Sequence, residues 1–383
     1  MPKELLQLDL DECYQEIIKD IFVRGSFTWE SDIPIEFQNY FLTRTRNDGI
    51  QLLIYEKIAN SSEWKNRPLG LIEALSAAAK NDAIIDGLRQ QDFVQLAQTL
   101  SEKGIEPILL KGAALSLSHY PASYLRTRSD TDFFIPENSI ENLRRIASDQ
   151  GYRFEEFMGG KFTQYQQSFS GKDALGVNHI YDAHWRLCNP QLFAGVLSYE
   201  EVLEQAVSVE IFGLKIKIIS PEHALLHACI HRIAHHYDEQ KLIWLYDIHL
   251  LLNRQNDEAR DAFYKLAHHK EMRAVCYQGF IHAQNWFQTP IPEGWLALFK
   301  TGVTEEKSAK FITLKPRIWD VFFNNFSALG GWQKRLRFVW EQFFPSRGFM
   351  IQKYSIKNTV FLPWFYCYRL VAGFPKLFQK LKS

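Results

Sequence analysis

Apolar residues recur at three- and four-residue spacing through the first hundred positions of the chain. The pattern is clear over residues 5–22, 35–58 and 69–100, and the last stretch contains no proline. This spacing is typical of amphipathic helices that bury one face. We therefore predict a helical region over residues 1–104, whose main role is packing; direct contact with a substrate is the alternative.

The pattern changes at Gly104. Residues 105–110 form a short apolar run of strand length between Gly104 and Gly112, and residues 113–119 then fit one or two helical turns. Gly112 permits a tight turn and the close approach of a ligand to the backbone. The first N–H groups of the following helix would suit an anion.

A polar loop and a second strand follow. The loop contains Arg126 and Arg128 and leads into Asp130-Thr131-Asp132. Since side chains alternate along a strand, Asp130 and Asp132 are predicted to share one face, roughly 6–7 Å apart. Such a pair can reach a hard cation. An Asp-x-Asp sequence is also common in loops and in structural pairs, so this motif alone leaves both interpretations open.

Further strands are predicted over residues 152–157, 162–169 and 178–187, with a helix over residues 139–150. Within the last strand, Asp182 and His184 share one face. A carboxylate that is flanked by apolar residues needs a partner if it is buried. An ion pair with Arg186 or another nearby base is therefore the structural alternative to a catalytic role for Asp182.

A strand over residues 211–219, with Gly213 as a turn point, precedes a helix that carries four regularly spaced histidines. Ser220 is placed to cap this helix, with Pro221 at its first position. The histidines are His223, His227, His231 and His235. Their spacing raises the possibility of a zinc site, but the row drifts around the helix by roughly 40° per step. We expect them to pack in the core or contact phosphates, and His236 to lie on the surface.

The remaining sequence predicts helices. The first spans residues 241–252, and its Asp247 is expected to pair with a neighbouring helix. The segment 360–378 is rich in aromatic residues and is followed by Lys380 and Lys382. Its prolines leave too little for a membrane span. We expect it to dock on the protein's own helices; a peripheral contact with a membrane or a partner protein is the alternative.

Composition narrows the classes of function. The chain has 44 basic and 44 acidic residues, so no global positive field favours nucleic acid, and sequence-specific binding to it is not expected. Five cysteines, without a Cys-x-x-Cys motif, argue against a disulfide framework or a thiolate zinc site. They suit a reducing compartment, and the N-terminus lacks a signal-peptide pattern. We therefore expect a cytoplasmic protein without a membrane-spanning helix.

Several segments between residues 90 and 260 resemble the uncharacterised nucleotidyltransferase branch of the superfamily typified by DNA polymerase beta. Each segment is short, and together they are specific. The matching segments are Leu110-Lys111-Gly112, Tyr120, Arg126, Asp130-Thr131-Asp132 with Phe133-Phe134-Ile135, Asp182 to Leu187, His227, His231, and Trp244 to Asp247.

The resemblance implies an α+β fold, with a small mixed-sheet nucleotidyltransferase core over residues 105–220 and helical regions over 1–104 and 221–383. It implies two Mg²⁺ ions, with Mn²⁺ as a substitute, and a nucleoside triphosphate, ATP being the first expectation. The implied metal-binding and catalytic carboxylates are Asp130, Asp132 and Asp182. The implied nucleotide-binding residues are Lys111, Gly112, Arg126, Arg128 and His184. The superfamily has Gly-Ser at the turn, whereas here Lys111 would supply a cation to the phosphates.

The sequence therefore predicts transfer of a nucleoside monophosphate to a hydroxyl group of an acceptor that it does not identify. The acceptor could be a small molecule, a peptide or a protein, including a target in a peptide-biosynthesis or antitoxin-like system. The rival interpretation is a non-catalytic nucleotide-binding or scaffold protein that retains the fold. The arrangement of Asp130, Asp132 and Asp182 distinguishes the two, since catalysis needs them to converge near Gly112.

Overall fold

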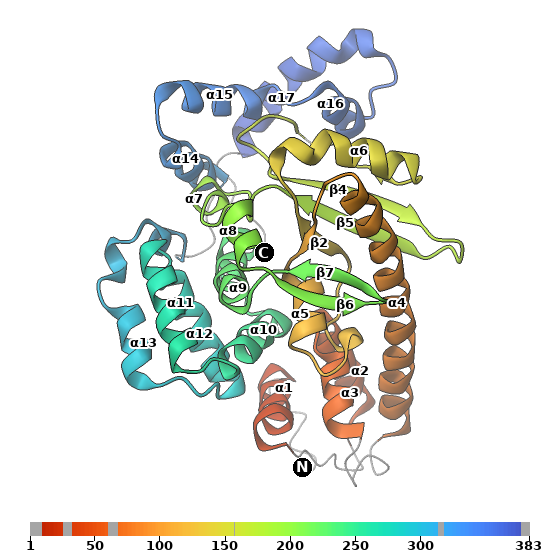
Figure 1. Cartoon of the computed structure of the whole chain (residues 1–383), viewed down its shortest axis with the longest axis vertical. Coiled ribbons are helices and arrows are strands. Elements are labelled where there is room, and N and C mark those ends of the chain that lie inside the picture. Colours follow the sequence, from red (N-terminus) through yellow and green to blue (C-terminus); the bar gives the residue numbers. More distant parts are fainter. Residues whose placement is uncertain (1–9, 26–32, 60–67, 157, 313–317, 377–383) are drawn as a thin grey trace.

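A computed structural model describes residues 10–25, 33–59, 68–156, 158–312 and 318–376. Its centre is a seven-stranded mixed sheet with the order β3-β4-β5-β2-β1-β7-β6 (Figure 1). The strands are β1 (Ile108–Leu109), β2 (Thr131–Phe134), β3 (Arg153–Phe154), β4 (Gln166–Lys172), β5 (Asn178–His184), β6 (Val207–Ile211) and β7 (Leu214–Ile218). With helices before and after this sheet, the predicted α+β fold is confirmed.

Strand pairing sets which side chains meet at the middle of the sheet. β1 is antiparallel to β2 and parallel to β7, and β2 is parallel to β5. The register of β2 and β5 places Asp132 opposite Asp182 and Phe134 opposite His184. Because side chains alternate, the intervening Phe133 and Ala183 point to the other face, where both are buried.

Helices α1 (Leu10–Lys19), α2 (Ile35–Asn47), α3 (Gln51–Ala59) and α4 (Leu69–Glu102) precede the sheet. Part of the first predicted helix, residues 5–9, lies outside the described residues. The single helix predicted over 35–58 is wrong, because the chain breaks at Gly49, where φ is +73°. α4 runs along one side of the sheet (Figure 1). Its Phe93 lies 5.9 Å from the ring of Phe133 and 6.2 Å from that of Tyr181, so α4 covers the apolar face.

The turn predicted at Gly213 within the segment 211–219 is confirmed, and the strand after it is β7, but the strand before it, β6, begins earlier, at Val207. β6 and β7 form a hairpin, and its turn residues Phe212 and Gly213 both have positive φ values of 47° and 80°. Two positive values in succession match the twist of a two-residue hairpin turn.

The helices within and after the sheet are α5 (Lys111–Ser118), α6 (Ile140–Asp149), α7 (Gln191–Ala194), α8 (Tyr199–Glu204), α9 (Pro221–His236), α10 (Leu242–Asn253), α11 (Asp257–His269), α12 (Arg273–Phe287) and α13 (Glu293–Lys300).

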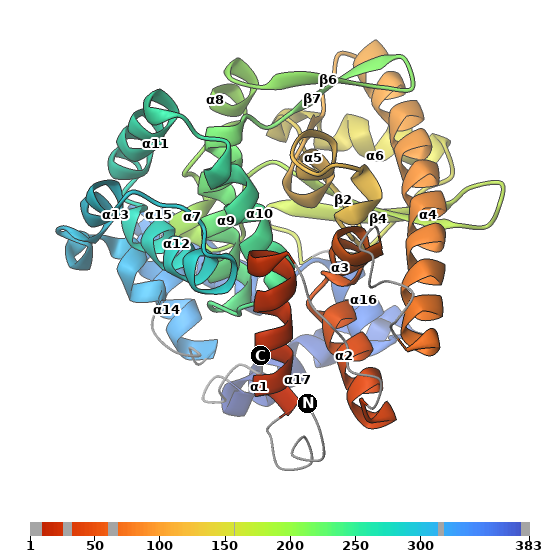
Figure 2. The ribbon, with the colours of Figure 1, turned by 90° about the horizontal axis from the view of Figure 1, so that it is seen from below.

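α9 begins as the sequence predicts. The Ser220 hydroxyl accepts a hydrogen bond from the backbone N–H of His223, and Pro221 occupies the first helical position. α9 packs against α10 and α12, which makes these three helices one layer. Figure 2 shows α9 and α10 on one side of the sheet centre and α4 on the other.

The last four helices, α14 (Ile318–Ala328), α15 (Trp332–Phe343), α16 (Arg347–Tyr354) and α17 (Leu362–Lys376), gather at one end of the molecule (Figure 1). Buried Glu341 on α15 accepts hydrogen bonds from the backbone N–H groups of Lys161 and Phe162, which ties α15 to the core. α17 packs on α15 and α16, as docking on the protein's own helices predicts; residues 377–383 lie outside the described residues. Within the described ranges, every helix is too short or too polar to cross a membrane.

Candidate active site

A cavity of about 500 Å³ opens where the central strands meet the layer of α9 and α10. The start of α5, the loop before β2 and the first residues of β2 form one wall, and α9 and α10 form the other. Lys111, Gly112, Arg126, Arg128, Asp130 and Asp132 all line this cavity. The structure therefore brings most of the predicted site residues to one place.

The carboxylate of Asp132 lies at the centre of a compact polar group. Its Oδ1 atom is 2.6 Å from Nζ of Lys111 and 2.9 Å from Nε2 of His184, and these two nitrogens are 3.5 Å apart. All three residues are shielded from solvent to a large degree. Burial raises the pKa of Asp132, but the charge of Lys111 and the hydrogen bond from His184 outweigh it and hold the pKa well below its ordinary value. Asp132 is therefore ionised at neutral pH.

Asp182 completes this group from the neighbouring strand. One ligand atom each from Asp132, Asp182 and His184 can be chosen so that all lie within 4.8 Å of one another. The Asp182 carboxylate accepts hydrogen bonds from the hydroxyl of Ser168 and from Nε2 of Gln166, both on β4. The ion pair of Asp182 with Arg186, the structural alternative, is wrong.

Arg186 instead lies 3.7 Å from the carboxylate of Glu137. Among the described residues, the hydrogen-bond donors to Asp182 are thus the neutral side chains of Gln166 and Ser168 on β4.

Asp130 lies just before β2 and lines the same cavity. Burial raises the pKa of its carboxyl group, and the negative charges of Asp132 and Asp182 raise it further. The three predicted carboxylates therefore share one electrostatic environment. The tight ligand group, however, contains His184 with Asp132 and Asp182, whereas the sequence assigned His184 to the nucleotide.

Two carboxylate oxygens and an imidazole nitrogen are ligands that a divalent cation can accept. The donor set and its spacing therefore fit a metal ion held by Asp132, Asp182 and His184. The Lys111 ammonium group is the cation that neutralises Asp132 in this arrangement. Among the described residues, no other cluster of histidine, cysteine and acidic side chains has this geometry.

The Lys111-Gly112 turn differs from its prediction in detail. Lys111, and not Gly112, has the left-handed backbone conformation, with φ at 47°. A Cβ atom on Gly112 would lie 3.0 Å from Cζ of Arg126 and 3.1 Å from its Nη1. The glycine is required here because a guanidinium group packs directly against the backbone, so the close approach is made by a side chain of the protein itself.

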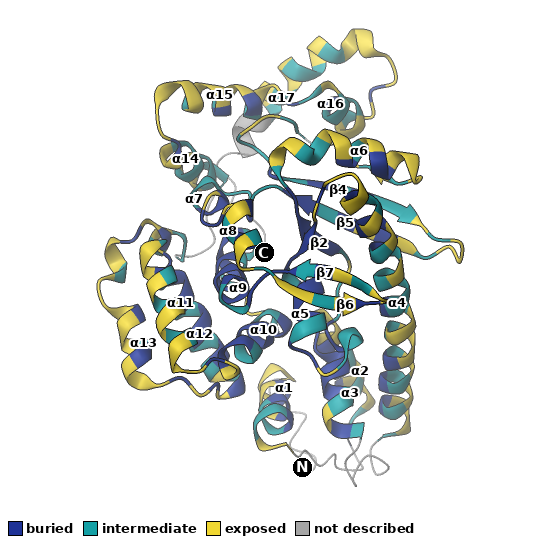
Figure 3. Ribbon diagram, viewed as in Figure 1, coloured by how far each residue is buried: buried dark blue, intermediate teal, exposed yellow. Residues whose placement is uncertain are grey.

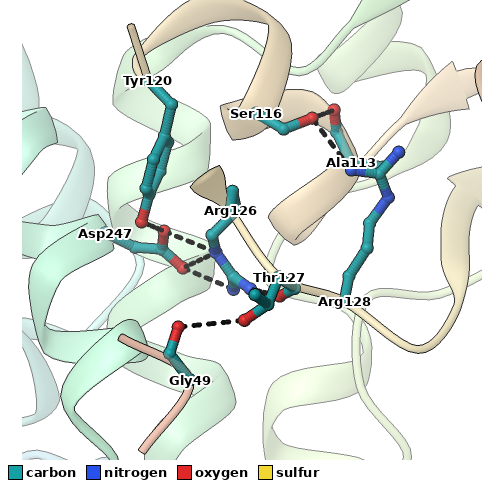
Figure 4. A network of polar contacts seen from close by, with 8 residues as sticks. All are labelled: Gly49, Ala113, Ser116, Tyr120, Arg126, Thr127, Arg128 and Asp247. Carbon is teal, nitrogen blue, oxygen red and sulfur yellow. Dashed lines mark hydrogen bonds and ion pairs between the residues drawn. The ribbon is translucent and has the colours of Figure 1, made fainter. Parts of the chain in front are cut away.

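Arg126 belongs to a buried network (Figure 4). Its Nη2 lies 2.7 Å from Oδ2 of Asp247, and its Nε lies 2.8 Å from Oδ1. The Tyr120 hydroxyl donates to the same carboxylate over 2.7 Å. The partner of Asp247 is thus a loop arginine, and the predicted pairing with a neighbouring helix is wrong. Burial lowers the pKa of Arg126, the negative charge of Asp247 raises it, and the resulting pKa of Arg126 lies above its ordinary value.

Arg128 is also paired. Its guanidinium group lies 2.8 Å from the carboxylate of Asp86 on α4 and 3.3 Å from the hydroxyl of Ser116. In Figure 4 it extends toward Ser116, away from the Arg126–Asp247 pair. Both predicted nucleotide-binding arginines therefore reach the cavity wall with their guanidinium groups already bound to carboxylates.

The helix break at Gly49 supports this loop. The Thr127 hydroxyl donates a hydrogen bond of 2.9 Å to the carbonyl of Gly49 (Figure 4). A Cβ atom on Gly49 would lie 2.9 Å from Cγ2 of Ile243, and φ is +73°. By contrast, Gly104 has nearly the same φ, +76°, but its Cβ position meets no atom within 4 Å. An alanine at either position would therefore have a strained backbone, but only an alanine at position 49 would also clash with a neighbouring side chain.

We expect Gly49→Ala to lower the free energy of unfolding by about 1–3 kcal/mol more than Gly104→Ala does. Both substitutions carry the cost of a left-handed alanine, and only the first also forces Ile243 to move. Urea unfolding of the two variants beside the wild-type chain measures the difference. Equal losses would show that the packing around Gly49 adapts without cost.

The opposite wall of the cavity is aromatic and basic. The ring centroids of His236 and Trp244 are 3.9 Å apart, and Nζ of Lys241 lies 5.2 Å from the centroid of Trp244. Arg46, on α2, lines the same cavity. The prediction that His236 is a surface residue is therefore wrong. Burial, followed by the charge of Lys111, lowers the pKa of His236 to about 4, so this ring is neutral at pH 7.

The row of histidines on α9 divides between locations. His227 and His231 line the cavity, while His235 lines a second, smaller cavity of about 230 Å³. Burial, followed by the charge of Lys111, holds the pKa of His227 and His231 well below the ordinary value. Nε2 of His227 is buried and has no hydrogen-bond partner among the described residues. This row is not a metal site, but it presents neutral rings to the cavity.

Sequence reasoning assigned no role to Arg46 or Lys241. Each is a single basic residue near a helix end, and no local motif marks it. Trp244 was noticed only as part of the family resemblance. These residues become part of the site because α2 and α10 meet at the Gly49 break, where the backbone N–H of Ile243 donates to the carbonyl of Asp48.

Paired aspartates on adjacent parallel strands, beside a Lys-Gly turn at a helix start, define the nucleotidyltransferase class of site. A family model described as "Uncharacterised nucleotidyltransferase" matches residues 38–288, well over half of the chain. The chain belongs to this family. The match contains every residue of the cavity described above, and it confirms the family that the sequence motifs indicate.

The other comparisons are more distant. No curated protein matches the chain significantly. Among solved structures, the chain is similar to an antigenic nucleotidyltransferase-like protein from Paracoccidioides brasiliensis, with 17% sequence identity and a TM-score of 0.30 over 52% of this chain and 96% of that one. A TM-score of this size supports no argument about fold or function.

Proposed function

We propose that this protein is a metal-dependent nucleotidyltransferase that moves a nucleoside monophosphate from a nucleoside triphosphate, ATP in the first instance, to a hydroxyl group of an acceptor. One observation carries the proposal. Asp132 and Asp182 face each other across two parallel strands, within 4.8 Å of His184, and Asp132 lines a cavity of about 500 Å³.

The carboxylate end of the cavity is the reacting end. Asp132, Asp182 and His184 would hold the cation, with Asp130 beside them. Bound Mg²⁺ or Mn²⁺ would neutralise the charge that develops on the phosphate oxygens and on the leaving pyrophosphate. Asp182 would accept the proton of the attacking hydroxyl group, the role that the family resemblance gives to the third carboxylate.

Lys111 would bind the phosphate groups of the nucleoside triphosphate. Its ammonium group lies 2.6 Å from Asp132 in this structure, and its side chain is long enough to turn toward an anion in the cavity it lines. A compact, strongly hydrated point charge suits a phosphate oxygen. This assignment replaces the serine hydroxyl of the superfamily with a cation. Arg126 and Arg128 act as positioning residues, because their guanidinium groups are already paired.

The aromatic end of the cavity suits the base or a planar part of the acceptor. Trp244 and His236 offer neutral ring faces, and base–aromatic stacking contributes about 1–3 kcal/mol per base. Arg46 and Lys241 add positive charge to the cavity lining, which favours an anionic ligand. The acceptor itself, whether a small molecule, a peptide or a protein, is not specified by these residues.

One observation favours the rival function, a nucleotide-binding protein without catalysis. The Asp132 carboxylate already contacts the Lys111 ammonium group and the His184 ring, so its charge is neutralised by a side chain of the protein itself. In that case nucleotide would bind equally well with and without a divalent cation, and no pyrophosphate would form.

Calorimetric titration with each of the four nucleoside triphosphates tests the proposal, with Mg²⁺, with Mn²⁺ and with a chelator. We expect binding that depends on the divalent cation, and pyrophosphate release once an extract containing the acceptor is added. Binding that the chelator leaves unchanged, together with no pyrophosphate from any extract, would favour the rival function. Absence of nucleotide binding under all conditions would exclude both.

A further inference from the structure

The C-terminal helices carry large apolar side chains in solvent. On α15, Trp332, Leu336 and Trp340 follow one another at four-residue intervals and are 69%, 65% and 62% exposed. Residues four apart lie on the same face of a helix. Figure 3 shows the outer faces of these helices as mainly exposed. This is the first of two apolar rows.

The second row follows α17 and the turn before it. Its members are Val360, Phe361, Trp364, Tyr368 and Val371, each more than half exposed. Their spacing of three and four residues places them on one face of the helix. The two rows together we call the aromatic surface. A single exposed apolar residue is common on a protein surface, but this many exposed apolar residues on neighbouring helices are unusual.

The folding of these helices holds the aromatic surface outward. On α15 the opposite face is buried through Phe338 and Glu341. On α17 the hydroxyl of Tyr366 donates to the carbonyl of Pro345 over 2.7 Å, and Arg369 donates to the carbonyl of Gln342 over 3.1 Å. The exposed rows are therefore the outer faces of docked helices and not parts of a detached tail.

The charge of this region differs from that of the whole chain. Residues 318–372 contain seven lysines and arginines but only two acidic residues, a net charge of +5 in a chain whose formal net charge is zero. One of the two acids, Glu341, is buried. Lys334, Arg337, Arg347 and Lys357 are exposed. Lys334 and Arg337 thus lie between the apolar residues of α15, while Arg347 on α16 and Lys357 between α16 and α17 lie near them in the sequence.

We propose that the aromatic surface docks onto an anionic lipid bilayer. Tryptophan and tyrosine favour the boundary between headgroups and acyl chains, and lysine and arginine are attracted to anionic headgroups. The helices lie on the bilayer and do not cross it, because α15 and α17 have 12 and 15 residues. Protein interfaces are depleted in lysine relative to the rest of the surface, so the exposed side chains of Lys334 and Lys357 favour a lipid partner over a protein.

Flotation of the full-length chain with vesicles tests this docking without any nucleotide, so it does not depend on the proposed enzymatic function. One set of vesicles is zwitterionic phosphatidylcholine, and the other contains about one-third phosphatidylglycerol. We expect binding to the anionic vesicles that weakens as salt is added, and little binding to the zwitterionic ones.

Surface substitutions sharpen the test. The double variant Trp364→Ser/Tyr368→Ser is expected to bind anionic vesicles about tenfold more weakly, and Lys334→Gln and Lys357→Gln about fivefold more weakly each. All four side chains are exposed, so folding is not at stake; circular dichroism checks it. The matched control is Leu175→Ser, at a residue that is 75% exposed in the turn between β4 and β5, and we expect this variant to bind like the wild type.

Two results would overturn the proposal. Equal binding of the control and of the double variant would show that the aromatic surface is not the contact. Failure to bind anionic vesicles, together with a concentration-dependent dimer that Trp364→Ser/Tyr368→Ser abolishes, would identify a protein interface instead.

Discussion

The substitution Asp132→Asn is expected to reduce nucleotidyl transfer by at least about 1,000-fold in kcat/KM. Asp132 contacts both Lys111 and His184, and it belongs to the ligand group with Asp182. An asparagine keeps the shape but removes the negative charge. Loss of several kcal/mol of charge stabilisation in the transition state corresponds to this reduction.

Two measurements separate catalysis from folding in this variant. Pyrophosphate release gives kcat/KM, and Mn²⁺ titration by calorimetry gives metal affinity, which should fall in parallel. The matched control is Asp173→Asn. Asp173 also pairs with a histidine, lying 3.0 Å from Nε2 of His179, but it does so at the turn after β4 and not at the cavity. The control should keep full activity. Unchanged Mn²⁺ affinity in Asp132→Asn would refute the metal assignment.

The local elements of the fold were predictable from the sequence, because each has a local cause. Ser220 and Pro221 mark the start of α9, and the apolar run after Gly104 marks β1. The failures also have local causes that the pattern hides. The positive φ of Gly49 ends α2 inside an apolar row that continues into α3. The turn at Gly213 was predictable from the glycine, whereas the start of β6 at Val207 was not.

The candidate site was predictable where the family resemblance supplied long-range information. Alternation along each strand places Asp132 and Asp182 on a defined face, but only the parallel pairing of β2 with β5 sets them opposite each other. His184 was assigned to the nucleotide because sequence spacing does not reveal that it reaches across to Asp132. The contact between His184 and Asp132 follows from the register in which β2 pairs with β5, and the local sequence of either strand does not reveal that register.

Pairings between distant residues were beyond sequence reasoning. Arg126 and Asp247 are 121 positions apart, and Arg128 meets Asp86 on a helix that precedes the sheet. A basic residue in a loop near two aspartates fits a phosphate-binding role equally well until its partner is known. The role of Gly112 was ambiguous for the same reason. A glycine allows a bound ligand to approach the backbone closely, and it equally allows the Arg126 guanidinium group to do so.

The buried pair of Arg126 and Asp247 leads to the second large effect. We expect Asp247→Ala to lower the free energy of unfolding by about 3–5 kcal/mol, because it leaves the Arg126 guanidinium group buried without a counter-charge. Arg126 and Asp247 are only 7% and 4% exposed, and Tyr120 loses its acceptor as well. Urea unfolding measures the change. The control is Asp257→Ala, since Asp257 also lies 2.9 Å from an arginine, Arg260, but is 97% exposed and should matter little.

The double variant Arg126→Met/Asp247→Leu then decides the role of Arg126. Removing both charges takes away the unpaired group, so most of the lost stability should return. If Arg126 only positions the loop, this refolded variant should bind nucleoside triphosphate with nearly wild-type affinity. If Arg126 contacts the phosphates, stability should return while affinity falls by about tenfold or more, the cost of a lost charged hydrogen bond. Both outcomes assume that the Arg126–Asp247 ion pair stabilises the fold that places Arg126 against Gly112. If Asp247→Ala destabilised the protein no more than Asp257→Ala does, that assumption would be contradicted.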